Sequence, residues 1–138
     1  MLEQIMNSST MDYLSRGLSA ANLRQSVISN NIANVNTPNF KKSDVIFEDL
    51  LAKELYGDTS GRLALVRTHD NHLPIATGPN AVEARVELQG TTTMRVDKNN
   101  VDIDVEMANL AKNQVYYNSM AKEIGSYITR IKSSISSK

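Results

Sequence analysis

Only a few places in this 138-residue chain combine side chains that could bind a metal ion. His69 and His72 lie three positions apart, a spacing that suits a metal site when further ligands complete it on an ordered frame. They lie between turn signals, however, in a stretch predicted to be a solvated loop. Segment 97–102 resembles a calcium-binding loop, but Val101 and Asp102 stand where a ligand and a glycine are needed. We therefore expect no metal ion and no cofactor.

A second candidate for chemistry is a group of three acidic residues, Asp102, Asp104 and Glu106, which alternate with apolar residues. Paired carboxylates can act as general acid and base, but they need a pocket that controls access of water. The alternation instead suits the exposed face of a strand that runs into a helix. The chain also has no cysteine, no Gly-rich phosphate loop and no nucleophile elbow. We expect no catalytic residues and no enzymatic activity.

Composition excludes further classes of protein. The 15 basic and 15 acidic side chains balance, which leaves no electrostatic footprint of a nucleic-acid binder. The longest apolar run is 63–66, so no transmembrane segment is expected. The first residues have neither a basic region nor an apolar stretch, and we expect no cleaved secretory signal. Aromatic residues amount to 5% and Trp is absent, which predicts a thin hydrophobic core.

The two ends of the chain are predicted to be long helices, because apolar and small residues recur there at alternating spacings of three and four. Ser9 is a predicted cap of the first helix, Pro38 is predicted to end it, and Asp104 is a predicted N-cap of the second. The N-terminal seam consists of Met11, Leu14, Leu18, Ala21, Gln25, Ile28, Ile32 and Val35. The C-terminal seam consists of Met107, Leu110, Gln114, Tyr117, Ala121, Ile124, Ile128, Ile131 and Ile135.

These seams predict a mainly α fold whose N- and C-terminal helices pair as an antiparallel coiled coil. An ordinary bundle would use a wider apolar stripe. The positions beside the seams are neutral and polar. This favours helices that are buried on several sides by other helices over helices whose polar face is solvated. One register, in which facing residue numbers sum to 142, places Ala21 opposite Ala121. An isolated pair of such helices is expected to be marginally stable and to gain stability from neighbouring subunits.

The chain is predicted to have two parts. A terminal coiled-coil domain comprises 1–38 and 104–138, and a charged middle segment, 39–103, holds most of the charged residues and is expected to be partly disordered. Within it, 44–56 is predicted to be a short amphipathic helix, followed by turn signals over 57–81. Alternating apolar and polar residues predict a small β element or a loop over 82–88, 94–96 and 101–105.

The most specific stretch is 29–40, with the sequence SNNIANVNTPNF. Asn side chains bond local backbone, so the stretch predicts an elaborate helix C-terminus followed by a turn. It resembles the motif A-N-N-I-A-N-x-x-T-P-G-Y of the flagellar axial proteins, the family of rod, hook and hook-associated proteins. Asn39 replaces the usual Gly, and because Asn tolerates a left-handed conformation the turn is expected to survive. The candidate assembly residues are Asn30, Asn31, Asn34, Thr37, Pro38 and Phe40, the last of which lacks the hydroxyl of the usual Tyr.

The resemblance implies a structural subunit of the bacterial flagellar basal-body rod. The short chain and the stretches 95–108 and 113–117 are similar to a subunit of the proximal rod. The resemblance further implies terminal helices in an inner coiled-coil layer, export by the flagellar type III apparatus, and a place in the periplasm-spanning rod that transmits torque to hook and filament. The implied partners are other rod subunits, the adaptor protein of the basal-body ring and the export apparatus. Two different surfaces on one chain favour helical assembly over a closed dimer.

Two alternatives remain open from the sequence. One is another axial protein, such as the second proximal-rod subunit. The other is a secreted helical-hairpin chaperone or binding module, which would form a stable, discrete oligomer in solution. A rod subunit would instead be a monomer of low helicity that gains helix on assembly.

Overall fold

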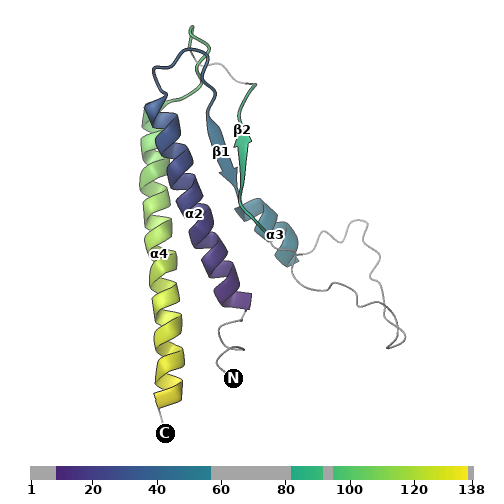
Figure 1. Ribbon diagram of the computed structural model, residues 1–138, viewed down its shortest axis with the longest axis vertical. Helices are drawn as coiled ribbons and strands as arrows, with labels where there is room; N and C mark the ends of the chain where they lie inside the picture. The colour runs from purple at the N-terminus through teal and green to yellow at the C-terminus, as the bar shows by residue number, and fades with distance from the viewer. Residues whose placement is uncertain (1–8, 57–81, 92–94, 137–138) are drawn as a thin grey trace, which may run out of the picture.

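The computed structural model describes residues 9–56, 82–91 and 95–136. These residues form, in order, helix α2 (Ser9–Ala33), strand β1 (Ser43–Ile46), helix α3 (Glu48–Tyr56), strand β2 (Arg85–Leu88) and helix α4 (Ile103–Ser136). Helices α2 and α4 pack side by side in opposite directions, and the two strands lie along one side of α2 (Figure 1). The predicted mainly α fold with paired terminal helices is thus confirmed. The predicted loop over 57–81 lies outside the described residues.

Helix α4 begins two residues earlier than its predicted cap implies. The Asp102 side chain accepts hydrogen bonds from the backbone N–H groups of Asp104 and Val105, at 3.0 and 3.4 Å, and the Asp102 carbonyl accepts from the Glu106 N–H. Asp102 is therefore the N-cap, and the prediction of Asp104 was wrong. Both are aspartates before the same apolar run, so the sequence pattern does not separate them. None of the helices in the described part of the chain is long and apolar enough to cross a membrane.

The register between the two long helices also differs from the predicted one. Asn113 donates a hydrogen bond from Nδ2 to the carbonyl of Ala21 at 2.9 Å, so the residue opposite Ala21 lies eight positions before Ala121. At Gly17 a Cβ atom would stand 2.8 Å from the sulfur of Met120. The predicted register was wrong because it was chosen by matching apolar residues. Some of the residues by which α4 contacts α2 are polar, such as Asn113.

The middle segment contains a strand where a helix was expected. The predicted helix over 44–56 begins only at Glu48, because residues before it form β1. Strand β1 pairs antiparallel with β2, with Ser43 opposite Leu88 and Ile46 opposite Arg85. Val45 and Phe47 are both buried, and their spacing of two fits a strand even though Val45 also fits the helical period. The predicted β element at 82–88 is present as β2, whereas residues 103–105 belong to α4.

The buried side chains of this fold are few, and nearly half of them are polar or charged. Among the described residues the buried hydrophobic side chains are Ala20, Ala21, Ile28, Val45, Phe47 and Val101. The largest fully buried side chains are instead Glu106, Asn31, Asn99 and Asn100. Hydrogen bonds within the chain therefore take over part of the role that an apolar core has in most domains of this size.

The close approach of α2 and α4 at Gly17 gives a first prediction. Replacing Gly17 with Leu forces Met120 and its neighbours apart, and we expect the free energy of unfolding to fall by about 1–3 kcal/mol. Gly125 is the matched control, because a Cβ there meets no atom within 4 Å. Gly125→Leu should raise the free energy of unfolding by up to about 1 kcal/mol through helix propensity. Urea denaturation measures both, and equal effects would contradict the tight contact.

An ion pair fastens α3 to α2 and gives a pH-dependent prediction. Arg24 donates to Glu48 Oε2 at 2.6 Å, and this bond holds the pKa of the Glu48 carboxyl below its usual value of 4.5. A lowered pKa means that the stabilisation is present above the ordinary value and is lost as the pH falls through the lowered one. We expect the wild type to be more stable than Glu48→Gln at about pH 7, with the difference shrinking as the pH falls through the lowered pKa of Glu48.

Thermal unfolding across that pH range tests this prediction. The control is Glu123→Gln, which breaks the exposed pair between Glu123 and Arg130, also 2.6 Å apart. Because both side chains of that pair are more than half exposed, the substitution should change stability little at any pH. A constant gap between wild type and Glu48→Gln over the whole range would contradict the assignment.

Candidate assembly site at the closed end of the helical hairpin

The predicted assembly residues cluster where α2 ends and α4 begins, at the top of Figure 1. The turn 34–42 leaves α2 at this end, and the segment 95–102 returns the chain to α4. Four polar side chains at this end are buried, and only the first of them is a predicted assembly residue, namely Asn31, Asn99, Asn100 and Glu106. Some polar groups of the site therefore bind inside the fold, and others reach the surface.

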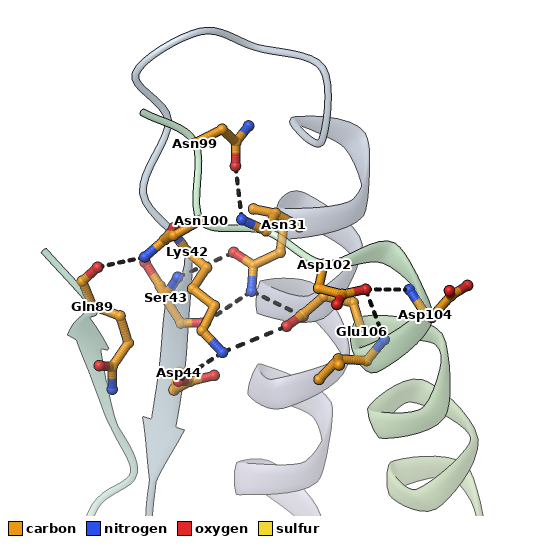
Figure 2. A network of polar contacts seen from close by, with 12 residues as sticks. Asn31, Lys42, Ser43, Asp44, Gln89, Asn99, Asn100, Asp102, Asp104 and Glu106 are labelled. Atoms are coloured by element: carbon orange, nitrogen blue, oxygen red, sulfur yellow. Dashed lines mark hydrogen bonds and ion pairs between the residues drawn. The ribbon is translucent and has the colours of Figure 1, made fainter. Parts of the chain in front are cut away.

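Asn31 joins three parts of the structure through one carboxamide (Figure 2). The N–H of Ser43 donates to Asn31 Oδ1 at 3.1 Å, and Asn31 Nδ2 donates to the Ser43 carbonyl at 2.9 Å. The same nitrogen donates to Glu106 Oε2 on α4 at 3.0 Å. The side chain is only 1% exposed, and both of its donor hydrogens and its acceptor oxygen are used. Asn31 thus pairs with β1 as a neighbouring strand would, while also binding α4.

Glu106 brings a buried negative charge to this junction. Its side chain is 1% exposed, and Lys42 Nζ lies 4.0 Å from its Oε1 atom and 3.7 Å from Asp44 Oδ2. Apart from that ion pair, Oε1 accepts no hydrogen bond within the described residues. A buried carboxylate is stabilised only when it is paired and hydrogen-bonded. The bond from Asn31 to Oε2 and the charge of Lys42 near Oε1 offset part of the cost of burying Glu106.

Asn99 closes the end of α2. It is fully buried, and its Nδ2 lies 3.0–3.1 Å from the carbonyl oxygens of Asn34, Val35 and Thr37. Its Oδ1 accepts from the N–H of Val101 at 2.7 Å. These three carbonyls belong to the turn that follows Ala33, the last residue of α2. The neutral amide of Asn99 therefore binds the turn after the helix without burying a charge.

Asn100 inserts its carboxamide into the end of the two-stranded sheet. The N–H of Lys42 donates to Asn100 Oδ1, and Asn100 Nδ2 donates to the carbonyl of Gln89, both at 2.7 Å. Lys42 and Gln89 are also bonded directly to each other, because the Gln89 N–H donates to the Lys42 carbonyl at 2.9 Å. The side chain therefore acts as an extra peptide group between the strand ends. Asn99 and Asn100 together tie the segment before α4 to both α2 and the sheet.

The turn after α2 is built from the remaining motif residues. Asn34 Nδ2 donates to the Asn30 carbonyl at 2.9 Å, and the Thr37 hydroxyl donates to Asn34 Oδ1 at 3.2 Å. Asn39 has a φ of 62°, in the left-handed region that glycine favours, and its N–H donates to the Asp97 carbonyl at 2.9 Å. The prediction that Asn39 substitutes for the usual Gly of the turn is confirmed. Phe40 is partly buried, and its N–H donates to the Thr37 carbonyl at 3.3 Å.

The six candidate assembly residues thus have different surroundings. Asn30, Thr37 and Pro38 are exposed, Asn34 and Phe40 are partly buried, and Asn31 is buried. Asn99 and Asn100 were not predicted as site residues, because the sequence showed them only within a failed calcium loop and within the stretch 95–108 that carries the resemblance. In the structure Asp97 Oδ1 accepts from the Asn99 N–H, and no group of three or more metal-binding side chains occurs among the described residues. His69 and His72 lie outside those residues.

The residues of the two predicted seams differ in how far they are buried. In the N-terminal seam, Ala21 and Ile28 are buried and Gln25 is exposed, while the others are partly buried, namely Met11, Leu14, Leu18, Ile32 and Val35. Val35 lies in the turn after α2, because the helix ends at Ala33 and not, as predicted, at Pro38. On α4, alternate seam residues are partly buried, namely Leu110, Tyr117, Ile124 and Ile131. The others are exposed, namely Met107, Gln114, Ala121, Ile128 and Ile135. The residues one position before the first three of these, Glu106, Asn113 and Met120, contact α2 instead.

Comparison with known proteins decides the family. Residues 11–41 match the family described as "Flagella basal body rod protein". The flagellar basal body rod protein FlgB of Bacillus subtilis (strain 168) is 34% identical over 125 residues, which cover 91% of this chain and 92% of the relative. FlgB of Borrelia hermsii is 42% identical over 110 residues, covering 78% and 82%. FlgB of Proteus mirabilis (strain HI4320) is 33% identical over 130 residues, covering 93% of each.

The chain belongs to the FlgB family of flagellar basal body rod proteins. It is therefore a structural subunit of the flagellar basal body rod, and other flagellar components are its partners. The family match covers most of α2 and the whole turn with Thr37, Pro38 and Asn39. The site described above is the end of the molecule at which that matched segment is hydrogen-bonded to the sheet and to the start of α4.

The junction at Asn31 gives a prediction about stability. Replacing Asn31 with Ala leaves the Ser43 backbone and the buried Glu106 without their partner, and we expect the free energy of unfolding to fall by about 2–3 kcal/mol. The neighbouring Asn30 is exposed, so Asn30→Ala should change it by less than about 0.5 kcal/mol. Chemical denaturation followed by circular dichroism measures both. Equal losses for the two substitutions would contradict the role given to Asn31.

Proposed function

We propose that this chain is a subunit of the proximal part of the rod, the drive shaft that carries motor torque to hook and filament. The observation that carries the proposal is the exposed face of α4. Met107, Ile128 and Ile135 are 51%, 50% and 58% exposed although they are large and apolar, and they lie on a helix whose neighbouring face already binds α2. Such a face favours burial by further helices, as in a layer of coiled coils.

The closed end of the hairpin supports a mechanical function. Packed interfaces deform little under load, and the carboxamides of Asn31, Asn99 and Asn100 bond α2, the sheet and the start of α4 to one another. Torque applied to one helix is therefore passed to the other through fixed contacts. The proposal needs no catalytic step, and we infer that the chain is not an enzyme.

The proposed partners follow from the same assignment. They are other rod subunits, the adaptor protein of the basal-body ring and the flagellar type III export apparatus, and the proposed place is the periplasm-spanning rod. Assembly is helical, because α2 and α4 present different surfaces, and unlike surfaces that match from copy to copy continue in one direction. The FlgB relatives favour this function over the helical-hairpin chaperone that the sequence left open.

Substitution of Ile128 tests the proposal. Ile128→Asp places a charge on a half-exposed position, so the circular dichroism of the purified chain should stay unchanged. If this face is buried in the rod, the unpaired charge prevents incorporation, and swimming in soft agar should be lost. Ser119→Asp is the control, because it introduces the same charge at an exposed position of α4 outside both faces. Normal swimming of the Ile128→Asp strain would contradict the buried face.

A further inference from the structure

Strand β2 is the outer strand of the two-stranded sheet. Figure 1 shows it on the side of β1 that faces away from α2. All four of its residues are exposed, and the apolar side chains of Val86 and Leu88 are 50% and 63% exposed. An exposed strand edge is a place where another extended segment can add to a sheet through backbone hydrogen bonds. The outer edge of β2 is therefore a candidate binding surface.

The backbone groups of Val86 are directed toward this outer edge. In an antiparallel pair, residues that exchange backbone hydrogen bonds alternate with residues that do not. The Gln89 N–H bonds the Lys42 carbonyl one step beyond the β1–β2 register, so Glu87 and Arg85 also direct their backbone groups toward β1. The N–H and C=O of Val86 point the other way, and no residue described outside the sheet bonds either group.

The opposite edge of the sheet is closed by α2. Asn31 exchanges two hydrogen bonds with the backbone of Ser43, and Arg24 donates to the Val45 carbonyl at 3.3 Å. Of the strands that the structure describes, β2 thus provides the one open edge. Two copies could share it only by pairing β2 with β2, and such a two-fold contact orients the copies in opposite directions. A rod that grows in one direction excludes that arrangement, so the occupant is a different protein.

The charges on β2 indicate what the occupant carries. Glu87 lies directly opposite Asp44 in the register, and like charges in this position are destabilising. Lys42 lies 3.7 Å from Asp44, whereas neither Glu87 nor Arg85 forms an ion pair within the described part of the chain. On an added antiparallel strand, the residues that face Glu87 and Arg85 belong to the pairs without hydrogen bonds, in which side chains lie closest. A basic residue opposite Glu87 and an acidic one opposite Arg85 complete both pairs.

We propose that the outer edge of β2 binds an extended segment of a different protein of the flagellum, an inference that rests on the proposed function as a rod subunit. The segment runs antiparallel to β2 and has a basic, an apolar and an acidic residue in succession. Its apolar residue exchanges two backbone hydrogen bonds with Val86, and its charged residues face Glu87 and Arg85. A shift by one residue would turn these charges to the other face of the sheet, so the charges fix one register.

The substitution Val86→Pro tests the open edge. Proline removes the outward N–H of Val86 and keeps every backbone bond between β1 and β2, so the purified chain should unfold at the same urea concentration as wild type. In cells, immunoblots of isolated basal bodies should show the Val86→Pro chain lost, and swimming in soft agar should be lost with it. Val86→Thr is the matched control, because it keeps the N–H and should support both. Incorporation of Val86→Pro in the wild-type amount would overturn the proposal.

Photocrosslinking identifies the occupant without disturbing the backbone of the edge. Leu88 is replaced with the photoreactive residue p-benzoyl-phenylalanine, and intact swimming cells are illuminated. We expect a link to one protein other than this chain, and mass spectrometry should place it beside a basic, an apolar and an acidic residue in succession. The control carries the same photoreactive residue at Leu55 of α3, which is 52% exposed and lies outside the sheet. It should not give that link.

Each outcome decides one claim. A link within the chain, a link to a second copy, a link to a segment without the charged pattern, or no link in rods that contain the variant would overturn the binding edge while leaving the proposed function intact. Immunoblotting of the wild-type chain in isolated basal bodies tests that function separately. If the wild-type chain is absent from basal bodies, the proposed function fails and the inference fails with it.

Discussion

The hydrogen bonds between the Asn31 carboxamide and the backbone of Ser43 connect α2 to β1, and the rest of the fold depends on them. A strand with unpaired N–H and C=O groups along one edge is unstable in a small domain and prone to pair with other chains. Strand β1 has β2 on one edge and α2 on the other, where Asn31 bonds Ser43 and Arg24 reaches the Val45 carbonyl at 3.3 Å. Because the same carboxamide also binds Glu106, it fixes where α4 stands relative to the strand.

The choice of asparagine follows from the amount of apolar material in the chain. With 5% aromatic residues and no Trp, the buried hydrophobic residues cannot fix the end of the hairpin alone. A carboxamide both donates and accepts hydrogen bonds without the desolvation cost of a charge. Asn99 bonds carbonyls of the turn after α2 and Asn100 bonds the ends of the sheet, so each buried amide replaces a backbone partner that the fold lacks. Hydrogen bonds from buried Asn side chains therefore fix the end of the molecule at which α2 ends and α4 begins.

The sequence was sufficient for the features that depend on local periodicity and insufficient for those that depend on polar contacts over long distances. The two helices, their antiparallel pairing and the left-handed turn at Asn39 follow from spacing and backbone preference. The register does not, because Glu106 and Asn113 face α2 and no apolar pattern marks them. Strand β1 was assigned to a helix because four residues are too few to separate the two periods. Asn99 gave no local signal, since its three acceptors lie more than 60 positions earlier.

The error in register has a physical meaning for a protein that assembles. Had the heptad positions Met107, Ala121 and Ile128 been used within the chain, as the sequence suggested, the folded subunit would have kept little apolar surface for its neighbours. Instead, hydrogen bonds from Asn31 and Asn113 set the internal register, and bonds of this kind are specific in direction and distance. Apolar burial is less directional but scales with area, and it suits contacts made many times along a rod. Hydrogen bonds therefore define the fold of the subunit, and the apolar residues left exposed on α4 remain available for contacts with other subunits.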